Sequence, residues 1–171
     1  MNIFVSRPSL IAPEFEDVYK EFQAFLVSEH FETRRLGGGT YSKKAFLRAV
    51  DDTMKLCSGA IVLGYPTEQM LYKAFRKGET QKTEHLWPTP WNHIEGALAY
   101  SLGLPLLVVA HEGIQGGVFD DGATGESVIR LDLAAKDWFK DERFTQPYAE
   151  WLADLGKTAS LAKAADPTNT A

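Results

Sequence analysis

Two uninterrupted apolar runs constrain the fold of this chain most strongly. They span residues 60–64 (AIVLG) and 105–110 (PLLVVA). A strand that is apolar at every position, and not only at alternate ones, must be buried on both faces, which is typical of a parallel sheet covered by helices. The two runs therefore predict the centre of an α/β domain, because parallel neighbours need helical crossovers between them.

The rest of the chain supplies strands and helices in alternation. Short β-prone runs predict further strands over residues 3–5, 31–36 and 128–131. Apolar residues at helical spacing predict helices over residues 13–29, from Ser42 to Cys57, over 92–102 and over 144–155. This order favours a three-layer Rossmann-like or flavodoxin-like sandwich with a central, mostly parallel five-stranded sheet.

The 171 residues suffice for one domain, which we expect to span residues 1–156. Residues 65–90 differ in character from their surroundings, since they gather basic side chains and lead into a proline- and tryptophan-rich stretch (WPTPW, 87–91). They are interpreted as an insertion with a short helix near 68–77. Residues 157–171, rich in Ala, Thr, Ser and Lys, are expected to form a flexible tail.

Charge and composition exclude several classes of protein. The chain carries 18 Lys and Arg against 23 Asp and Glu, a net charge of -5, so general nucleic-acid binding is not expected. No apolar run approaches the ~18 residues that a membrane span needs. The single Cys57 and an N-terminus without signal-peptide features favour a cytoplasmic protein whose partner is a small molecule.

In doubly wound sheets, ligands bind beyond the carboxyl ends of the strands, where the strand order reverses. Ser6 and Arg7 follow the first strand and can bind a sugar or phosphate, although a surface arginine before a proline turn explains Arg7 equally well. Tyr65 and Trp91 can stack on a base or simply pack. These residues, together with Asn92, are the substrate-binding candidates.

Glu95 is the candidate catalytic residue. If Asn92 caps the helix over 92–102, Glu95 is its third residue. One interpretation is a capping box, in which Glu95 only satisfies backbone donors. The other is that the helix amides and dipole keep Glu95 ionised, as a nucleophile requires. The sequence leaves both open.

Residues 95–109 (EGALAYSLGLPLLVV) resemble the signature of the nucleoside 2-deoxyribosyltransferase-like family. Residues 52–63 (DTMKLCSGAIVL) are similar to the family's Asp-bearing helix and third strand, and residues 3–6 to its opening strand and substrate loop; together the resemblance covers about residues 1–115. It implies that Glu95 attacks the anomeric carbon of a sugar. It also implies that Asp52 holds or protonates the leaving base.

The sequence departs from that family at two places. Ala60 stands where the family often has Asp, and residues 89–92 (TPWN) replace its glycine-rich lead-in. The spacing from Trp91 to Glu95 is instead similar to that of Toll/interleukin-receptor-like (TIR) domains, whose enzymatic members cleave the nicotinamide glycosidic bond of NAD. Asn92 stands where their pattern has Cys.

Both resemblances imply an enzyme that breaks an N-glycosidic bond with one Glu. The leading hypothesis is a transferase or hydrolase acting on nucleosides or nucleotides; the alternatives are a TIR-like NAD hydrolase or cyclase, and a non-catalytic nucleotide-binding module. No cofactor is expected. No metal site is expected either, since His93 has no ligand at suitable spacing. The family resemblance further implies a homodimer or a higher homo-oligomer.

Overall fold

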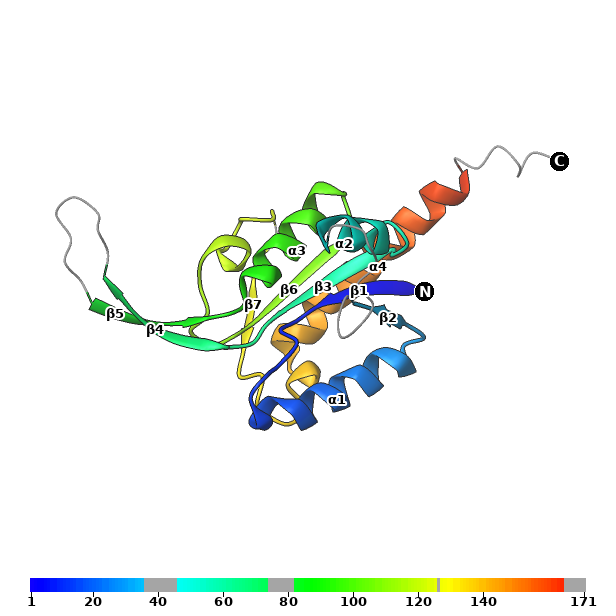
Figure 1. The fold of residues 1–171 in the computed structure, drawn as a ribbon. Helices are drawn as coiled ribbons and strands as arrows, with labels where there is room; N and C mark the ends of the chain where they lie inside the picture. Colours follow the sequence, from blue (N-terminus) through cyan, green and yellow to red (C-terminus); the bar gives the residue numbers. More distant parts are fainter. Residues whose placement is uncertain (36–45, 74–81, 126, 165–171) are drawn as a thin grey trace.

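The computed structural model describes residues 1–35, 46–73, 82–125 and 127–164. Its centre is a five-stranded sheet in the order β2-β1-β3-β6-β7, in which each neighbouring pair is parallel. The strands are β1 (Asn2–Ser6), β2 (Glu32–Arg34), β3 (Gly59–Gly64), β6 (Leu106–His111) and β7 (Ile129–Leu131). This is the flavodoxin-like order, so the expected α/β sandwich with a parallel five-stranded sheet is confirmed (Figure 1).

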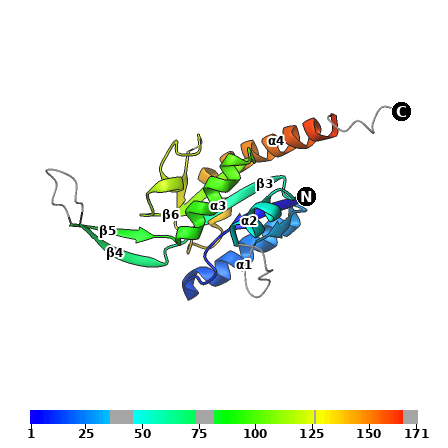
Figure 2. The same cartoon turned by 45° about the horizontal axis from the view of Figure 1, so that its top comes forward.

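Helices cover both faces of this sheet (Figures 1 and 2). One face carries α1 (Pro13–Ser28) and α4 (Glu142–Ala164), and the other carries α2 (Phe46–Met54) and α3 (Pro90–Ser101). Two 3-10 turns, η1 (Gly117–Phe119) and η2 (Trp138–Lys140), complete the layers. The two strongly apolar runs lie in the middle of the sheet, as their composition requires.

The alternation of side chains along the strands divides the core. In β3, Ile61 and Leu63 point to the layer of α1 and α4, whereas Ala60 packs with α2 and α3. All six residues of β3 are buried. Burial on both faces is therefore the reason for the uninterrupted apolar run.

The helix α1 forms where the sequence predicts it. Pro13 is at its first position, where the missing amide hydrogen costs nothing, and Glu14 and Glu16 lie near the positive end of the helix dipole. Its buried residues recur at spacings of three and four: Phe15, Tyr19, Phe22 and Leu26.

The insertion between β3 and α3 corrects one prediction. Over its described part, residues 68–73, the predicted short helix is wrong: β4 (Glu68–Lys73) pairs antiparallel with β5 (Lys82–Trp87), from Glu68 opposite Trp87 to Lys73 opposite Lys82. Residues 74–77 of that prediction lie outside the described residues. The resulting hairpin projects from the domain (Figures 1 and 2). Good helix-forming residues in this stretch give only a weak local preference, which strand pairing with a distant segment overrides.

Two other predicted boundaries differ or cannot be compared. The last helix does not end near Leu155 but continues through Gly156 to Ala164. The predicted glycine turn at 37–39, the Ser42 cap and residues 165–171 lie outside the described residues. The observed part of the second helix, Phe46–Met54, buries Val50 and Met54 as its pattern indicates.

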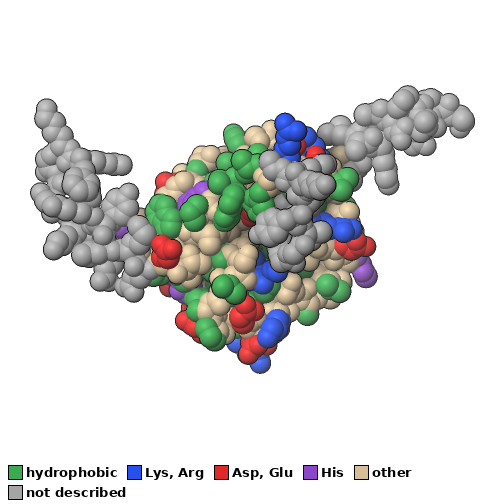
Figure 3. All heavy atoms as spheres, in the orientation of Figure 1, with side chains coloured by type: hydrophobic (Ala, Val, Ile, Leu, Met, Phe, Trp, Pro, Cys, Tyr) green, Lys and Arg blue, Asp and Glu red, His purple; other side chains and the backbone are tan. Residues whose placement is uncertain are grey.

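The surface mixes charges of both signs. On the face shown in Figure 3, acidic and basic side chains lie interspersed between apolar ones. Among the described residues, no helix is long and apolar enough to cross a membrane.

Candidate functional site

A pocket of about 820 Å³ opens at the carboxyl ends of β1 and β3. The sheet order reverses between these two strands, since β2 lies beyond β1 and β6 beyond β3. Four segments supply the described lining: residues 7–12 after β1, Phe46 of α2, residues 66–68 after β3, and Thr89, Trp91 and Glu95 around the start of α3. The pocket thus occupies the position at which doubly wound sheets bind ligands.

Glu95 extends from the second turn of α3 into this pocket, and only 6% of the residue is exposed. The helix begins at Pro90 with Thr89 as its N-cap residue, two positions before the start that the sequence predicts. Asn92 is therefore inside the first turn, and Glu95 is too far along the helix to form a capping box with it. The capping interpretation of Glu95 is wrong.

Burial dominates the electrostatics of Glu95. Removal from water raises the pKa of its carboxyl to about 7, and a hydrogen bond from the Ser6 hydroxyl acts in the opposite direction. The expectation that the helix N-terminus keeps this group firmly ionised is corrected, because the carboxyl lies in the second turn and is largely desolvated. It gains and loses a proton near neutral pH, a property found at catalytic carboxyls.

Asn92 is fully buried and joins three elements. Its Nδ2 donates to Ser6 Oγ at 3.0 Å and to the Leu63 carbonyl at 3.4 Å. Its Oδ1 accepts a hydrogen bond from Thr89 Oγ1 at 2.9 Å. The amide therefore binds the ends of β1 and β3 to the start of α3, directly beneath the pocket. Asn92 is not among the described residues that line the pocket, and its contact with substrate stays a prediction.

Arg7 places a positive charge in the pocket wall. Its guanidinium lies 4.2 Å from the centroid of the Tyr19 ring, and Nη1 donates to the Pro8 carbonyl at 2.8 Å. Among the described residues, its buried Nε has no hydrogen-bond partner. Stacking on Tyr19 fixes the guanidinium at the pocket wall, and a guanidinium in that position can pair with an anionic ligand.

The two aromatic candidates, Trp91 and Tyr65, differ in their exposure to the pocket. Trp91 is 45% exposed, lines the pocket, and meets Phe46 edge to face at 4.4 Å between ring centroids. Tyr65 is completely buried and packs edge to face on Phe15 and Tyr19. Tyr65 is therefore a core residue, and Trp91 is the aromatic side chain available to a ligand.

Asp52 does not join the other candidates. It is exposed on α2 and is not among the described residues that line the pocket. Val50 and Met54 face the sheet from the same helix, and a residue two positions from each points to the opposite side. Helix geometry therefore places Asp52 away from Glu95.

Sequence reasoning missed Thr89 and Phe46. Thr89 precedes a proline at the start of a helix, which is a recognisable N-cap pattern, but its hydroxyl bonds to Asn92 and makes no cap hydrogen bond. Phe46 carried no signal beyond its apolar character. In the part of the chain that the structure describes, no group of three or more His, Cys, Asp or Glu side chains is arranged to hold a metal ion.

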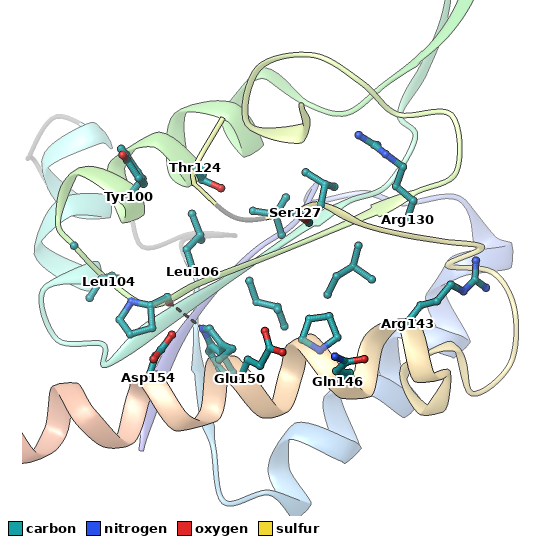
Figure 4. Close-up of a pocket in the computed structure, with 18 of the residues that line it drawn as sticks. Tyr100, Leu104, Leu106, Thr124, Ser127, Arg130, Arg143, Gln146, Glu150 and Asp154 are labelled. Atoms are coloured by element: carbon teal, nitrogen blue, oxygen red, sulfur yellow. Dashed lines mark hydrogen bonds between the residues drawn. The ribbon is translucent and has the colours of Figure 1, made fainter. Parts of the chain in front are cut away.

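A second cavity, of about 860 Å³, lies between the end of α3, the beginnings of β6 and β7, and α4 (Figure 4). Gln146, Glu150 and Asp154 project into it from α4. Arg130 directs its guanidinium away from α4 and donates to the carbonyls of Ile114 and Phe119 at 2.6 and 2.7 Å. This cavity is at the amino end of the strands, and none of the described residues that line it has a carboxyl buried like that of Glu95. The pocket at Glu95 is therefore the candidate site.

The fold is shared with a solved enzyme structure. The chain is similar to the Clostridium botulinum CMP N-glycosidase BcmB, with a TM-score of 0.51 and 13% sequence identity, over 90% of this chain and 99% of that chain. No protein-family model and no curated protein sequence matches this chain. Similarity at this level of identity identifies a common α/β architecture.

Proposed function

We propose that the protein cleaves the N-glycosidic bond of a nucleotide, with Glu95 as the nucleophile. The observation that carries the proposal is the position of the Glu95 carboxyl, which is buried at the wall of a pocket at the reversal point of a parallel sheet. The similarity in fold to a CMP N-glycosidase supports the choice of reaction.

The chemistry requires one ionised carboxylate beneath the sugar. A Glu95 oxygen attacks C1′, an ester bond forms, and the bond from C1′ to the base nitrogen breaks with its electron pair on the base, which then takes up a proton. Water hydrolyses the ester, releases the sugar and regenerates the Glu95 carboxylate. A carboxyl with a pKa of about 7 is ionised in a large fraction of molecules at neutral pH and carries little hydration to be removed.

The pocket favours a phosphorylated substrate over a free nucleoside. Arg7 is the one basic side chain among the described lining residues, and it lies beside the first-strand loop. A phosphate there would accept charge-assisted hydrogen bonds from the guanidinium. Trp91 offers an exposed ring edge and face for the base or sugar.

A substrate panel tests the proposal. The purified protein is incubated with the ribo- and deoxyribonucleoside monophosphates, the corresponding nucleosides and NAD, and free base or nicotinamide is measured by chromatography. We expect base release from at least one monophosphate, and loss of that activity in Glu95→Gln. Glu150→Gln, at an exposed Glu on α4, is the matched control and should retain activity.

Two results would contradict the proposal. Release of nicotinamide alone would assign the site to NAD. Tight nucleotide binding without turnover, unchanged in Glu95→Gln, would identify a binding module. Addition of a free second base with the active substrate separates transfer from hydrolysis, because only a transferase forms the exchanged nucleotide.

A further inference from the structure

Four polar side chains form a continuous series at the pocket: Thr89 and Glu95 line it, and Asn92 and Ser6 connect them. Thr89 Oγ1 bonds to Asn92 Oδ1 at 2.9 Å, and Asn92 Nδ2 bonds to Ser6 Oγ at 3.0 Å. Asn92 is fully buried, and Ser6 and Glu95 are almost so. Buried polar groups of this kind are costly unless each is satisfied, so their arrangement is tightly determined.

The Leu63 carbonyl fixes the direction of every hydrogen bond in the series. A carbonyl can only accept, so the Asn92 atom that faces it must be the amide NH₂ group. Asn92 Oδ1 then faces Thr89 and can only accept, which makes the Thr89 hydroxyl the donor. The NH₂ group donates to Ser6 Oγ, and the Ser6 proton is left free to be donated onward.

Glu95 lies where that proton can be received. It is three residues after Asn92 on α3, so the two side chains share one face of the helix. Ser6, at the end of β1, bonds to Asn92 and is the side-chain hydrogen-bond partner of the Glu95 carboxyl. The described charged side chains that share the pocket with Glu95 are Arg7, in the loop after β1, and Glu68, at the start of β4. The elements that contribute Phe46 and residues 8–12 present no described charge to the pocket.

We infer that Thr89 and Asn92 are positioning residues for Glu95: they orient the Ser6 hydroxyl so that its proton points to the Glu95 carboxyl. The orientation is a property of the protein itself. Its consequence for catalysis, that the ionised nucleophile is stabilised, rests on the proposed function. The lowering of the Glu95 pKa by Ser6 has the sign that this orientation requires.

The test measures the ionisation of Glu95 directly. The side-chain carboxyl ¹³C signals of glutamate-labelled protein are followed with pH by NMR, and Glu95→Gln assigns the signal. We expect Ser6→Ala to raise the midpoint of the Glu95 titration by about one pH unit and Thr89→Val by about half as much, because each removes stabilisation of the ionised form. Thr89→Ser, which keeps the hydroxyl, should restore the wild-type midpoint.

Thr53→Val is the matched control. The Thr53 hydroxyl is also half-buried, but it donates to the Ala49 carbonyl within α2, away from the pocket. It should lower stability without moving the Glu95 midpoint. In the active enzyme, Thr89→Val should move the acidic limb of the kcat profile in the same direction as the titration.

The titration separates failure of this inference from failure of the proposed function. An unmoved Glu95 midpoint in both Ser6→Ala and Thr89→Val, with folded proteins, would overturn the inference even if the enzyme cleaves nucleotides. A raised midpoint that Thr89→Ser restores would support it even if the substrate panel finds no base release. Equal shifts in Thr53→Val and Thr89→Val would also overturn it, since the effect would then be general.

Discussion

The Asn92 amide donates to the Ser6 hydroxyl across 3.0 Å, although the two residues are 86 positions apart in the sequence. This bond ties the first turn of α3 to the last residue of β1. It places Glu95, one turn further along α3, in the pocket at the carboxyl ends of β1 and β3. The position of the candidate nucleophile therefore depends on a polar contact between two elements, in addition to apolar packing.

The pH dependence of activity should reveal the role of Glu95. A nucleophile must be ionised, so kcat/KM should rise about tenfold per pH unit below pH 7 and level off above it, in accord with a pKa of about 7. Initial rates between pH 5 and 9 on the monophosphate substrate measure this. A profile that falls through pH 7 would instead assign Glu95 as a general acid.

Stability should depend on pH through the same group. The pKa of Glu95 is raised in the folded state to about 7 from an ordinary 4.5, so the folded protein holds this proton more tightly than the unfolded chain. The resulting stability is present in full below pH 4.5, falls as the pH rises to 7, and is constant above it. Glutamine does not titrate, so Glu95→Gln should exceed the wild type by about 3 kcal/mol above pH 7.

Urea unfolding of both proteins at pH 4.5, 6 and 8 measures that difference. We expect nearly equal unfolding free energies for the two proteins at pH 4.5 and a widening gap at pH 6 and 8. If the two proteins differed by the same unfolding free energy at all three pH values, the carboxyl would not be desolvated in solution.

Arg7 should discriminate nucleotides from nucleosides. Replacing it with Met removes the charge and retains much of the packing against Tyr19. Loss of charge-assisted hydrogen bonds is worth about 2 kcal/mol, so KM for the monophosphate should rise roughly 30-fold while cleavage of the nucleoside changes little. Steady-state kinetics on both substrates measure this, and an equal loss on both would remove Arg7 from phosphate recognition.

Two glycines that follow β6, Gly117 and Gly122, should differ in how much stability is lost when each is replaced by alanine. Gly117 and Gly122 both have positive φ, 59° and 78°, but a Cβ at Gly117 would lie 2.5 Å from His93 Nδ1, whereas one at Gly122 would meet nothing within 4 Å. Gly122→Ala should cost about 1 kcal/mol for backbone strain alone. Gly117→Ala should cost about 2 kcal/mol more, because it displaces His93. Chemical denaturation compares the two, and equal costs would contradict the close approach.

Most of the fold could be predicted from local pattern. The uninterrupted run in β3, the helical spacing of Phe15, Tyr19 and Phe22, and the strand at β6 each repeat a burial pattern that one element imposes on its own residues. The hairpin over Glu68–Lys73 and Lys82–Trp87 could not be predicted so. Its two strands are stabilised by pairing with each other, and the local sequence of either strand does not determine which residues pair.

The sequence by itself determined that this chain forms a parallel α/β sheet and that Glu95 lies near the start of a helix at the ligand-binding edge, because burial and helix periodicity follow from the pattern of neighbouring residues. Only the tertiary structure decided which polar side chains meet there. It brought Ser6 to Asn92 and Glu95, placed Tyr65 in the core and turned Asp52 to the surface. Hydrogen bonds and desolvation depend on distances between elements far apart in the chain, so they exist only once the strands and helices are packed.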